Sequence, residues 1–212
     1  AAKVDITDER GPVNDRLYAR ALVLKSGDTV ALLVTVDAVS FGEIGYIKND
    51  YLPNVRAKLQ KELGIPPGNT IFNASHCHGI VHPDIEARTV EAVKAAMKNL
   101  VPVKAGVGVG HETRIMENRR LILKSGREVD VRHAYSLPSD DQVASVGPVD
   151  SEIGILRLDG LDGEPVAVVY NFACHPIQNV PERGNTADIT GFSSKTIEEN
   201  LGCIALFVQG AG

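Results

Sequence analysis

The sequence predicts an α/β fold with a mixed β-sheet and flanking helices in a layered sandwich. Two strand-like runs within residues 16–36 are separated by the segment KSGD at 25–28, whose composition is typical of a hairpin turn. Residues 153–158 and 166–172 form a second such pair, around a turn at 159–163. Strand–helix–strand segments also occur, and they favour parallel pairing, whereas hairpins require antiparallel pairing. Together the two signals predict a mixed sheet.

The first half of the chain alternates strand and helix signals. After the first hairpin, residues 44–63 have helical spacing, and Gly64 closes that segment. A short strand is predicted at 70–74. An amphipathic helix is then predicted up to residue 100, opened by Asp84 as its N-cap.

The second half is less regular. Between residues 101 and 150 we expect a strand pair and a long loop. After the second hairpin, a helix is predicted at 191–201 and a last apolar strand at 203–208. A length of 212 residues fits one large domain or two small ones, and we expect residues 1–212 to form a single domain.

Composition excludes several classes of protein. At 22.7 kDa the chain is long enough to bury a core, and its 43% hydrophobic and 23% charged residues are ordinary for a globular domain. No apolar run approaches the roughly 20 residues of a membrane span. The net charge is −5, and the 22 basic residues form no block. We therefore expect neither a nucleic-acid partner nor a membrane-spanning segment.

The three cysteines, Cys77, Cys174 and Cys203, are odd in number and have no CxxC spacing. This excludes a disulfide scaffold and argues against a structural zinc site built from cysteines. The chain begins AAKV, without a charged segment followed by an apolar one, so a signal peptide is either absent or already removed. In the second case the protein would be secreted or periplasmic, and the compartment stays open.

Polar residues follow several of the apolar runs, where α/β proteins bind ligands. His76 and His78 are two residues apart, so in extended backbone both rings project to one side and can meet one metal ion. Alternatively, one ring binds the metal and the other faces a substrate. The plain alternative is two polar loop histidines without a common ligand.

His175 strengthens the metal hypothesis because it follows a second apolar strand and precedes Pro176. Imidazoles from two strand ends are suited to zinc, and a catalytic zinc lowers the pKa of its bound water to about 7. Asp37, at another strand end, is either a carboxylate that orients one of these histidines or a cap for the loop that follows it.

Two other motifs are set aside. Cys77 lies between two histidines, but alternation in extended backbone points it away from their rings, which favours a packed thiol over a nucleophile. The segment GVGVG at 106–110 has no following helix, so it is not a dinucleotide-binding fingerprint.

Five short motifs in sequence resemble landmarks of the amino-terminal domain of the neutral/alkaline (non-lysosomal) ceramidase family. Their order and spacing agree over essentially the whole chain. They are Ala2–Thr7, Leu17–Ala21, Ser75–Gly79, Phe172–Pro176 and Phe207–Gly212.

The resemblance implies a zinc-dependent amidohydrolase that cleaves an N-acyl amide bond. It assigns His76 and His175 as ligands of Zn²⁺ and places His78 beside the metal as a catalytic residue that faces the scissile amide. Asp188 resembles the aspartate of an SGDNxG segment in the family, and a helix-capping role is the alternative. The implied substrate is a lipid or other small-molecule amide.

The sequence also departs from the family pattern. The family motif continues His-Ser-Gly-Pro, whereas Gly79, Ile80 and Val81 follow His78 here. The family chain runs on beyond the position of Gly212, with further site residues. We therefore expect residues 1–212 to be incomplete at the C-terminal end. Such a piece is either inactive or works with the remainder of its own polypeptide as a second chain.

Two rival functions are kept. A domain of this fold without catalytic activity would bind a lipid or glycan headgroup, although the chain has no tryptophan and few aromatic residues for such a surface. A Cys–His hydrolase acting through Cys77 would lose activity on alkylation of its thiol and would be insensitive to chelators.

Overall fold

The computed structural model describes residues 1–131, 137–177 and 184–211. Its first sheet has the strand order β1-β2-β3-β4, in which the first three strands are antiparallel and β4 pairs parallel with β3. The parallel pair matters for function, because the carboxyl ends of β3 and β4 open into neighbouring loops. The strands are β1 (Ala2–Asp5), β2 (Tyr18–Ser26), β3 (Thr29–Val36) and β4 (Thr70–Ala74).

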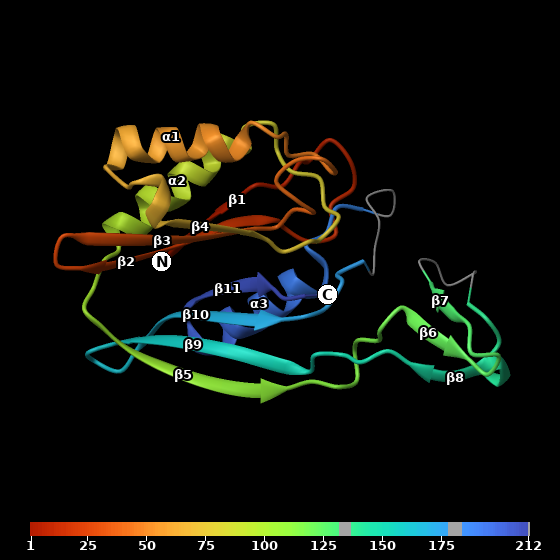
Figure 1. The fold of residues 1–212 in the computed structure, drawn as a ribbon. Coiled ribbons are helices and arrows are strands. Elements are labelled where there is room, and N and C mark those ends of the chain that lie inside the picture. The colour runs from red at the N-terminus through yellow and green to blue at the C-terminus, as the bar shows by residue number, and fades with distance from the viewer. Residues whose placement is uncertain (132–136, 178–183, 212) are drawn as a thin grey trace.

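A second sheet has the order β11-β10-β9-β5 and also mixes the two kinds of pairing. The β9–β10 pair is the second hairpin predicted from the sequence, and β10 and β11 are parallel neighbours. A smaller sheet, β7-β6-β8, extends to one side (Figure 1). The strands are β5 (Val103–His111), β6 (Arg120–Leu123), β7 (Glu128–Asp130), β8 (Val143–Val146), β9 (Glu152–Gly160), β10 (Pro165–Phe172) and β11 (Ile204–Gln209).

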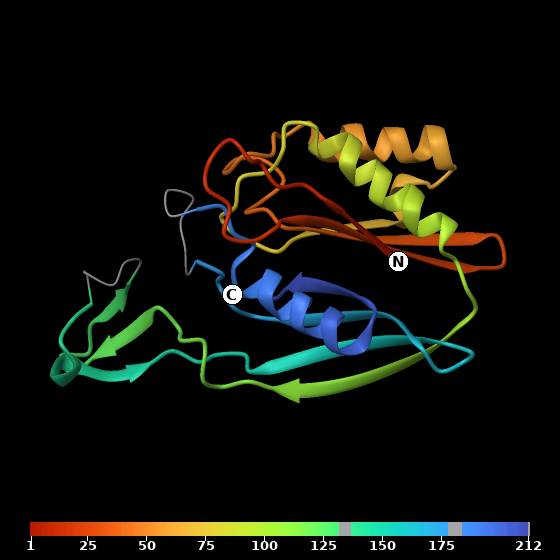
Figure 2. The ribbon, with the colours of Figure 1, turned by 180° about the vertical axis from the view of Figure 1, so that it is seen from behind.

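Helices flank both main sheets. The helices α1 (Tyr51–Leu63) and α2 (Ile85–Lys98) lie together over one face of the first sheet (Figure 1). The helix α3 (Asp188–Leu201) connects β10 to β11 and lies against the second sheet, in front of it when the molecule is seen from behind (Figure 2). Two single 3₁₀ turns, η1 (Pro67–Asn69) and η3 (Asp140–Gln142), precede β4 and β8. Within the described residues, no helix is both long enough and apolar enough to span a bilayer.

The largest core lies between α1, α2 and the first sheet, and it includes fully buried Val34, Val55 and Val93. A smaller cluster joins the two main sheets, where Leu22 of β2 packs with Leu206 of β11. Burial of such side chains stabilises a fold by about 1.5–3 kcal/mol each. The two main sheets are therefore packed against each other through this cluster.

The predicted α/β fold class is confirmed, with mixed sheets and flanking helices, but two segments differ from expectation. Helix α1 begins at Tyr51 instead of residue 44. The preceding residues form a loop in which Gly42 and Gly45 have positive φ and the Asn49 side chain accepts a hydrogen bond from the Glu43 N–H. Residues 101–150 contain β5 and the small sheet, while 132–136 lie outside the described residues.

Candidate metal centre

The loop that carries His76 and His78 continues the parallel pairing of β3 and β4. Beyond the strand ends, the Ser75 N–H donates to the Val36 carbonyl at 2.9 Å, and the His76 N–H donates to the Ala38 carbonyl at 2.9 Å. The loop after β4 is thus fixed against the loop after β3.

His76 has an unusual backbone, with φ at +66° in the left-handed region. The sequence-based expectation of extended backbone at this position is therefore wrong. The bend still directs the ring toward the other two histidines, and its Nδ1 lies 2.8 Å from the Val39 carbonyl. A carbonyl partner places the proton on Nδ1 and leaves the Nε2 lone pair to bind a cation.

His175 follows β10, in the second sheet, and Gln209 joins its strand end to the first sheet. The Gln209 N–H donates to Asn73 Oδ1 of β4 at 3.0 Å, and its side-chain Nε2 donates to the Cys174 carbonyl at 3.0 Å. One residue at the end of β11 therefore ties together the two strand ends that precede His76 and His175.

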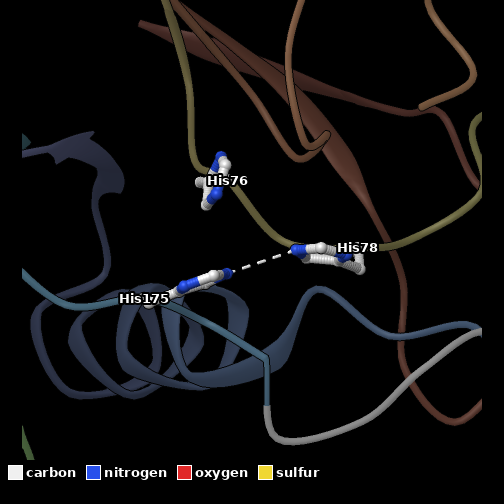
Figure 3. A group of neighbouring side chains, drawn as sticks. All are labelled: His76, His78 and His175. Carbon is white, nitrogen blue, oxygen red and sulfur yellow. Dashed lines mark hydrogen bonds between the residues drawn. The ribbon is translucent and has the colours of Figure 1, made fainter. Parts of the chain in front are cut away.

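The three predicted histidines converge, as Figure 3 shows. The ring centroids of His76 and His175 are 4.8 Å apart, and each lies 5.6 Å from the centroid of His78. The Nε2 atoms of His78 and His175 are 3.4 Å apart. One candidate ligand nitrogen from each ring lies within 4.8 Å of the other two.

This donor set fits a tetrahedral transition metal. Two nitrogens bound to zinc at about 2.0–2.1 Å with a tetrahedral angle lie about 3.3–3.4 Å apart, and the candidate ligand nitrogens of the three rings all lie within 4.8 Å of one another. Among the described residues the cluster contains three imidazoles and no carboxylate or thiolate. Such a set favours zinc or a similar metal over magnesium or calcium, which prefer oxygen.

The electrostatic environment favours the neutral forms of His78 and His175. Desolvation is the largest cause that lowers the pKa of both His78 and His175, and the neighbouring His76 lowers it further. Arg119 also lowers the pKa of His175, whereas Asp188 opposes the shift at both rings. Neutral imidazole is the form that binds a metal, so the site is suited to a cation at neutral pH.

Asp188 is buried at the start of α3, close enough to both histidines to act on their charge. Its φ is +57°, and its Oδ1 accepts a hydrogen bond from the Ile189 N–H at 2.6 Å. Asp188 therefore accepts a hydrogen bond from the backbone of the first turn of α3, as a capping residue does, although Ala187 occupies the N-cap position.

Asp37 does not orient a histidine through its observed hydrogen bonds. Its Oδ2 accepts from Arg20 at 2.7 Å and from the Tyr18 N–H at 2.9 Å, while the nitrogen of His76 faces the Val39 carbonyl instead. The interpretation of Asp37 as a carboxylate that holds a histidine is thus wrong. Asp37 forms a buried ion pair with Arg20 between β2 and β3.

Cys77 is fully buried, as expected from the sequence, and desolvation raises the pKa of its thiol to about 12. A nucleophilic cysteine needs a lowered pKa and access to substrate. The buried Cys77 thiol with its raised pKa does not supply the thiolate that a Cys–His hydrolase needs, which argues against that hypothesis.

A cleft of about 590 Å³ adjoins His175 on the side of the small sheet. His175 and Arg119 supply polar groups to its wall, and Met116, Val149 and Ile177 supply apolar surface. This mixture suits a ligand that has both a polar group and an apolar portion.

Comparison with solved structures shows that this chain has a ceramidase-like α/β fold. Two solved structures share this fold: neutral ceramidase from Pseudomonas aeruginosa, with a TM-score of 0.75, and a ceramidase complexed with C2, with a TM-score of 0.76. The sequence identity is 19% in both cases, and each match covers 98% of this chain. The chain spans only 36–37% of the length of those two proteins. No protein-family model matches the sequence.

The resemblance inferred from the sequence motifs is thus confirmed as structural similarity to neutral ceramidases. At 19% identity this similarity establishes the fold alone.

Proposed function

We propose that this chain is part of a zinc-dependent amidohydrolase that hydrolyses an N-acyl amide bond. The observation that carries the proposal is the convergence of His76, His78 and His175 from two sheets onto one point. The ceramidase-like fold supports the same reaction class, since the two similar structures are ceramidases.

His76 and His175 would hold the zinc ion through ring nitrogens, with the Nδ1 of His76 bonded to the Val39 carbonyl and the pKa of His175 lowered by burial. A zinc ion bound there supplies an activated water nucleophile at neutral pH. The protein's own part is to fix the ligand geometry through the loop contacts at Ala38 and Val39 and through Gln209.

His78 would act beside the metal ligands on the substrate. Its Nε2 lies 3.4 Å from that of His175, and burial lowers its pKa. A neutral imidazole there can accept a proton from the attacking water and return it to the leaving amine. The cleft beside His175 would receive the amide and part of its apolar acyl group.

Catalytic zinc sites use three protein ligands, frequently with a carboxylate or another donor besides histidine. The cluster within the described residues has imidazoles alone. We therefore propose that the active site also includes donors from a further segment of polypeptide, either in the same protein or in a partner chain. We also propose that residues 1–212 form a single domain of that protein.

A zinc titration by isothermal calorimetry at pH 7.5 tests the proposal. We expect one zinc per chain, and His76→Ala and His175→Ala should each weaken binding by more than about 100-fold, since even loss of a ligand's supporting partner costs 10–100-fold. His111→Ala is the control, because His111 ends β5, is exposed and lies outside the histidine cluster.

His78→Ala should keep one zinc per chain if His78 is catalytic and not a ligand. Zinc binding of ordinary strength in His76→Ala or His175→Ala would contradict the proposed metal site. No zinc binding by the unsubstituted chain together with the further segment would favour a domain that binds a headgroup without hydrolysis.

A further inference from the structure

His78 lies midway along a loop whose two ends are held by different parts of the molecule. On one side, His76 is fixed by Ala38 and Val39 beyond β3. On the other side, the Ile80 carbonyl accepts a hydrogen bond from the Asp8 N–H at 3.1 Å. The position of His78 relative to His175 therefore depends on how firmly Ile80 is held.

The side-chain amide of Asn185 forms hydrogen bonds with both the backbone N–H and the backbone carbonyl of Ile80. Asn185 Oδ1 accepts from the Ile80 N–H at 2.8 Å, and Nδ2 donates to the Ile80 carbonyl at 2.7 Å. The same Nδ2 donates to the Asp8 carbonyl at 3.1 Å. Asn185 is 3% exposed, so water cannot replace these contacts.

The backbone of Asn185 is fixed as well. Its N–H donates to the Pro12 carbonyl at 2.7 Å, and its carbonyl accepts from the Asn14 N–H at 2.8 Å. Asn185 is therefore a rigid support and not a side chain that adapts to the loop. It lies three residues before Asp188, where α3 begins.

The contact between the two segments leaves no spare room. A Cβ placed on Gly79 would lie 3.0 Å from Asn185 Oδ1 and 2.9 Å from the Thr186 carbonyl, and 2.5 Å from Leu17. Glycine is thus the residue that lets the loop next to His78 approach Asn185.

We propose that Asn185 is the positioning residue of the candidate site, which acts through Ile80 to hold the His78 ring beside His175. This inference rests on the proposed function for its catalytic meaning, but its geometry can be tested without any metal. Among the described residues, Asn185 has no hydrogen bond to the three histidine rings and does not line the cleft.

The sharpest variant is Asn185→Asp, which keeps the size of the side chain and the acceptor for the Ile80 N–H. A carboxylate cannot donate to the carbonyls of Ile80 and Asp8, and it places a negative charge against both oxygens. Asn69→Asp is the matched control, since Asn69 Nδ2 also donates to a backbone carbonyl, that of Val30, far from the histidines.

The measurement is the nuclear Overhauser effect between histidine ring protons in the metal-free 212-residue chain. In the unsubstituted chain and in Asn69→Asp, we expect cross-peaks for both the His78–His175 and the His76–His175 pairs. In Asn185→Asp, the His78–His175 cross-peak should weaken at least threefold while the His76–His175 cross-peak persists. A general loss of structure would weaken both.

Two unchanged cross-peaks in Asn185→Asp would overturn the proposal, and so would the equal loss of both in a folded protein. If Asn185→Asp does not fold, Gly79→Ala gives the same test from the other side of the contact, because it keeps the Asn185 donors and displaces the loop. Failure of the zinc titration would count against the proposed function alone, since these spectra involve no zinc.

Discussion

The histidines of the candidate site have different supports, although they share one cluster. His76 is bent into the left-handed region and bonded through Nδ1 to Val39. Non-glycine residues in that region store about 1–3 kcal/mol of backbone strain and are concentrated at functional sites. The His76 conformation therefore fits the role proposed for it as a preorganised metal ligand.

The lowered pKa values of His78 and His175 predict that the metal-free chain loses stability in mild acid. Between the lowered folded-state pKa and the ordinary value of 6.5, the unfolded chain binds more protons than the folded chain, so stability rises with pH. Stability should thus be complete above pH 6.5 and fall as the pH drops through the folded-state values.

Thermal unfolding followed by circular dichroism at pH 7.5 and 5.2 checks this prediction. The melting temperature should be lower at pH 5.2, by about 2–4 °C for each kcal/mol lost in a chain of this size. The double variant His78→Gln/His175→Gln should show a smaller drop. An equal drop in melting temperature in the unsubstituted chain and in the double variant would show that other titratable groups cause the loss of stability.

At this scale the sequence predicted the histidines but not their supports. His76, His78 and His175 follow apolar runs, and strand ends of α/β sheets gather at one edge. Asn185 and Gln209 could not be found in this way, because their importance comes from partners up to 177 residues away. Gln209 lies within the Phe207–Gly212 motif, whereas Asn185 lies in a segment without a recognisable pattern.

Elements were predictable where local chemistry determines them. Strand β4 has the predicted bounds of 70–74, and Gly64 ends α1 with φ at +68°. The start of α1 was missed because residues 44–50 have helical spacing but are held as a loop by contacts of Asn49 and Ser40. Spacing alone does not report such side-chain-to-backbone hydrogen bonds.

The C-terminal end of α1 provides a test of an element. Gly64→Ala should lower the free energy of unfolding by about 1 kcal/mol, because alanine at positive φ is strained while no atom lies within 4 Å of the added Cβ. Gly68→Ala is the control, with equal space and no positive φ. Urea denaturation measures the free energy of unfolding of both variants. An equal loss in Gly64→Ala and Gly68→Ala would show that the positive φ of Gly64 does not cause the destabilisation.

The whole molecule joins two sheets, a feature that the sequence did not reveal. Hairpins and crossovers indicate mixed pairing, but the division into separate sheets depends on contacts between distant strands, such as Leu22 of β2 with Leu206 of β11. This division places His76 and His175 on different sheets. The candidate site therefore forms only when the two sheets are packed together and joined by Gln209.

The central claim is that both sheets contribute an imidazole to one zinc ion. Anomalous diffraction at the zinc edge, on crystals of the chain grown with one equivalent of zinc, tests it most directly. We predict a single anomalous peak within about 2.0–2.1 Å of a ring nitrogen of both His76 and His175. A zinc peak elsewhere on the chain, or one bound by only one of these two histidines, would contradict the account.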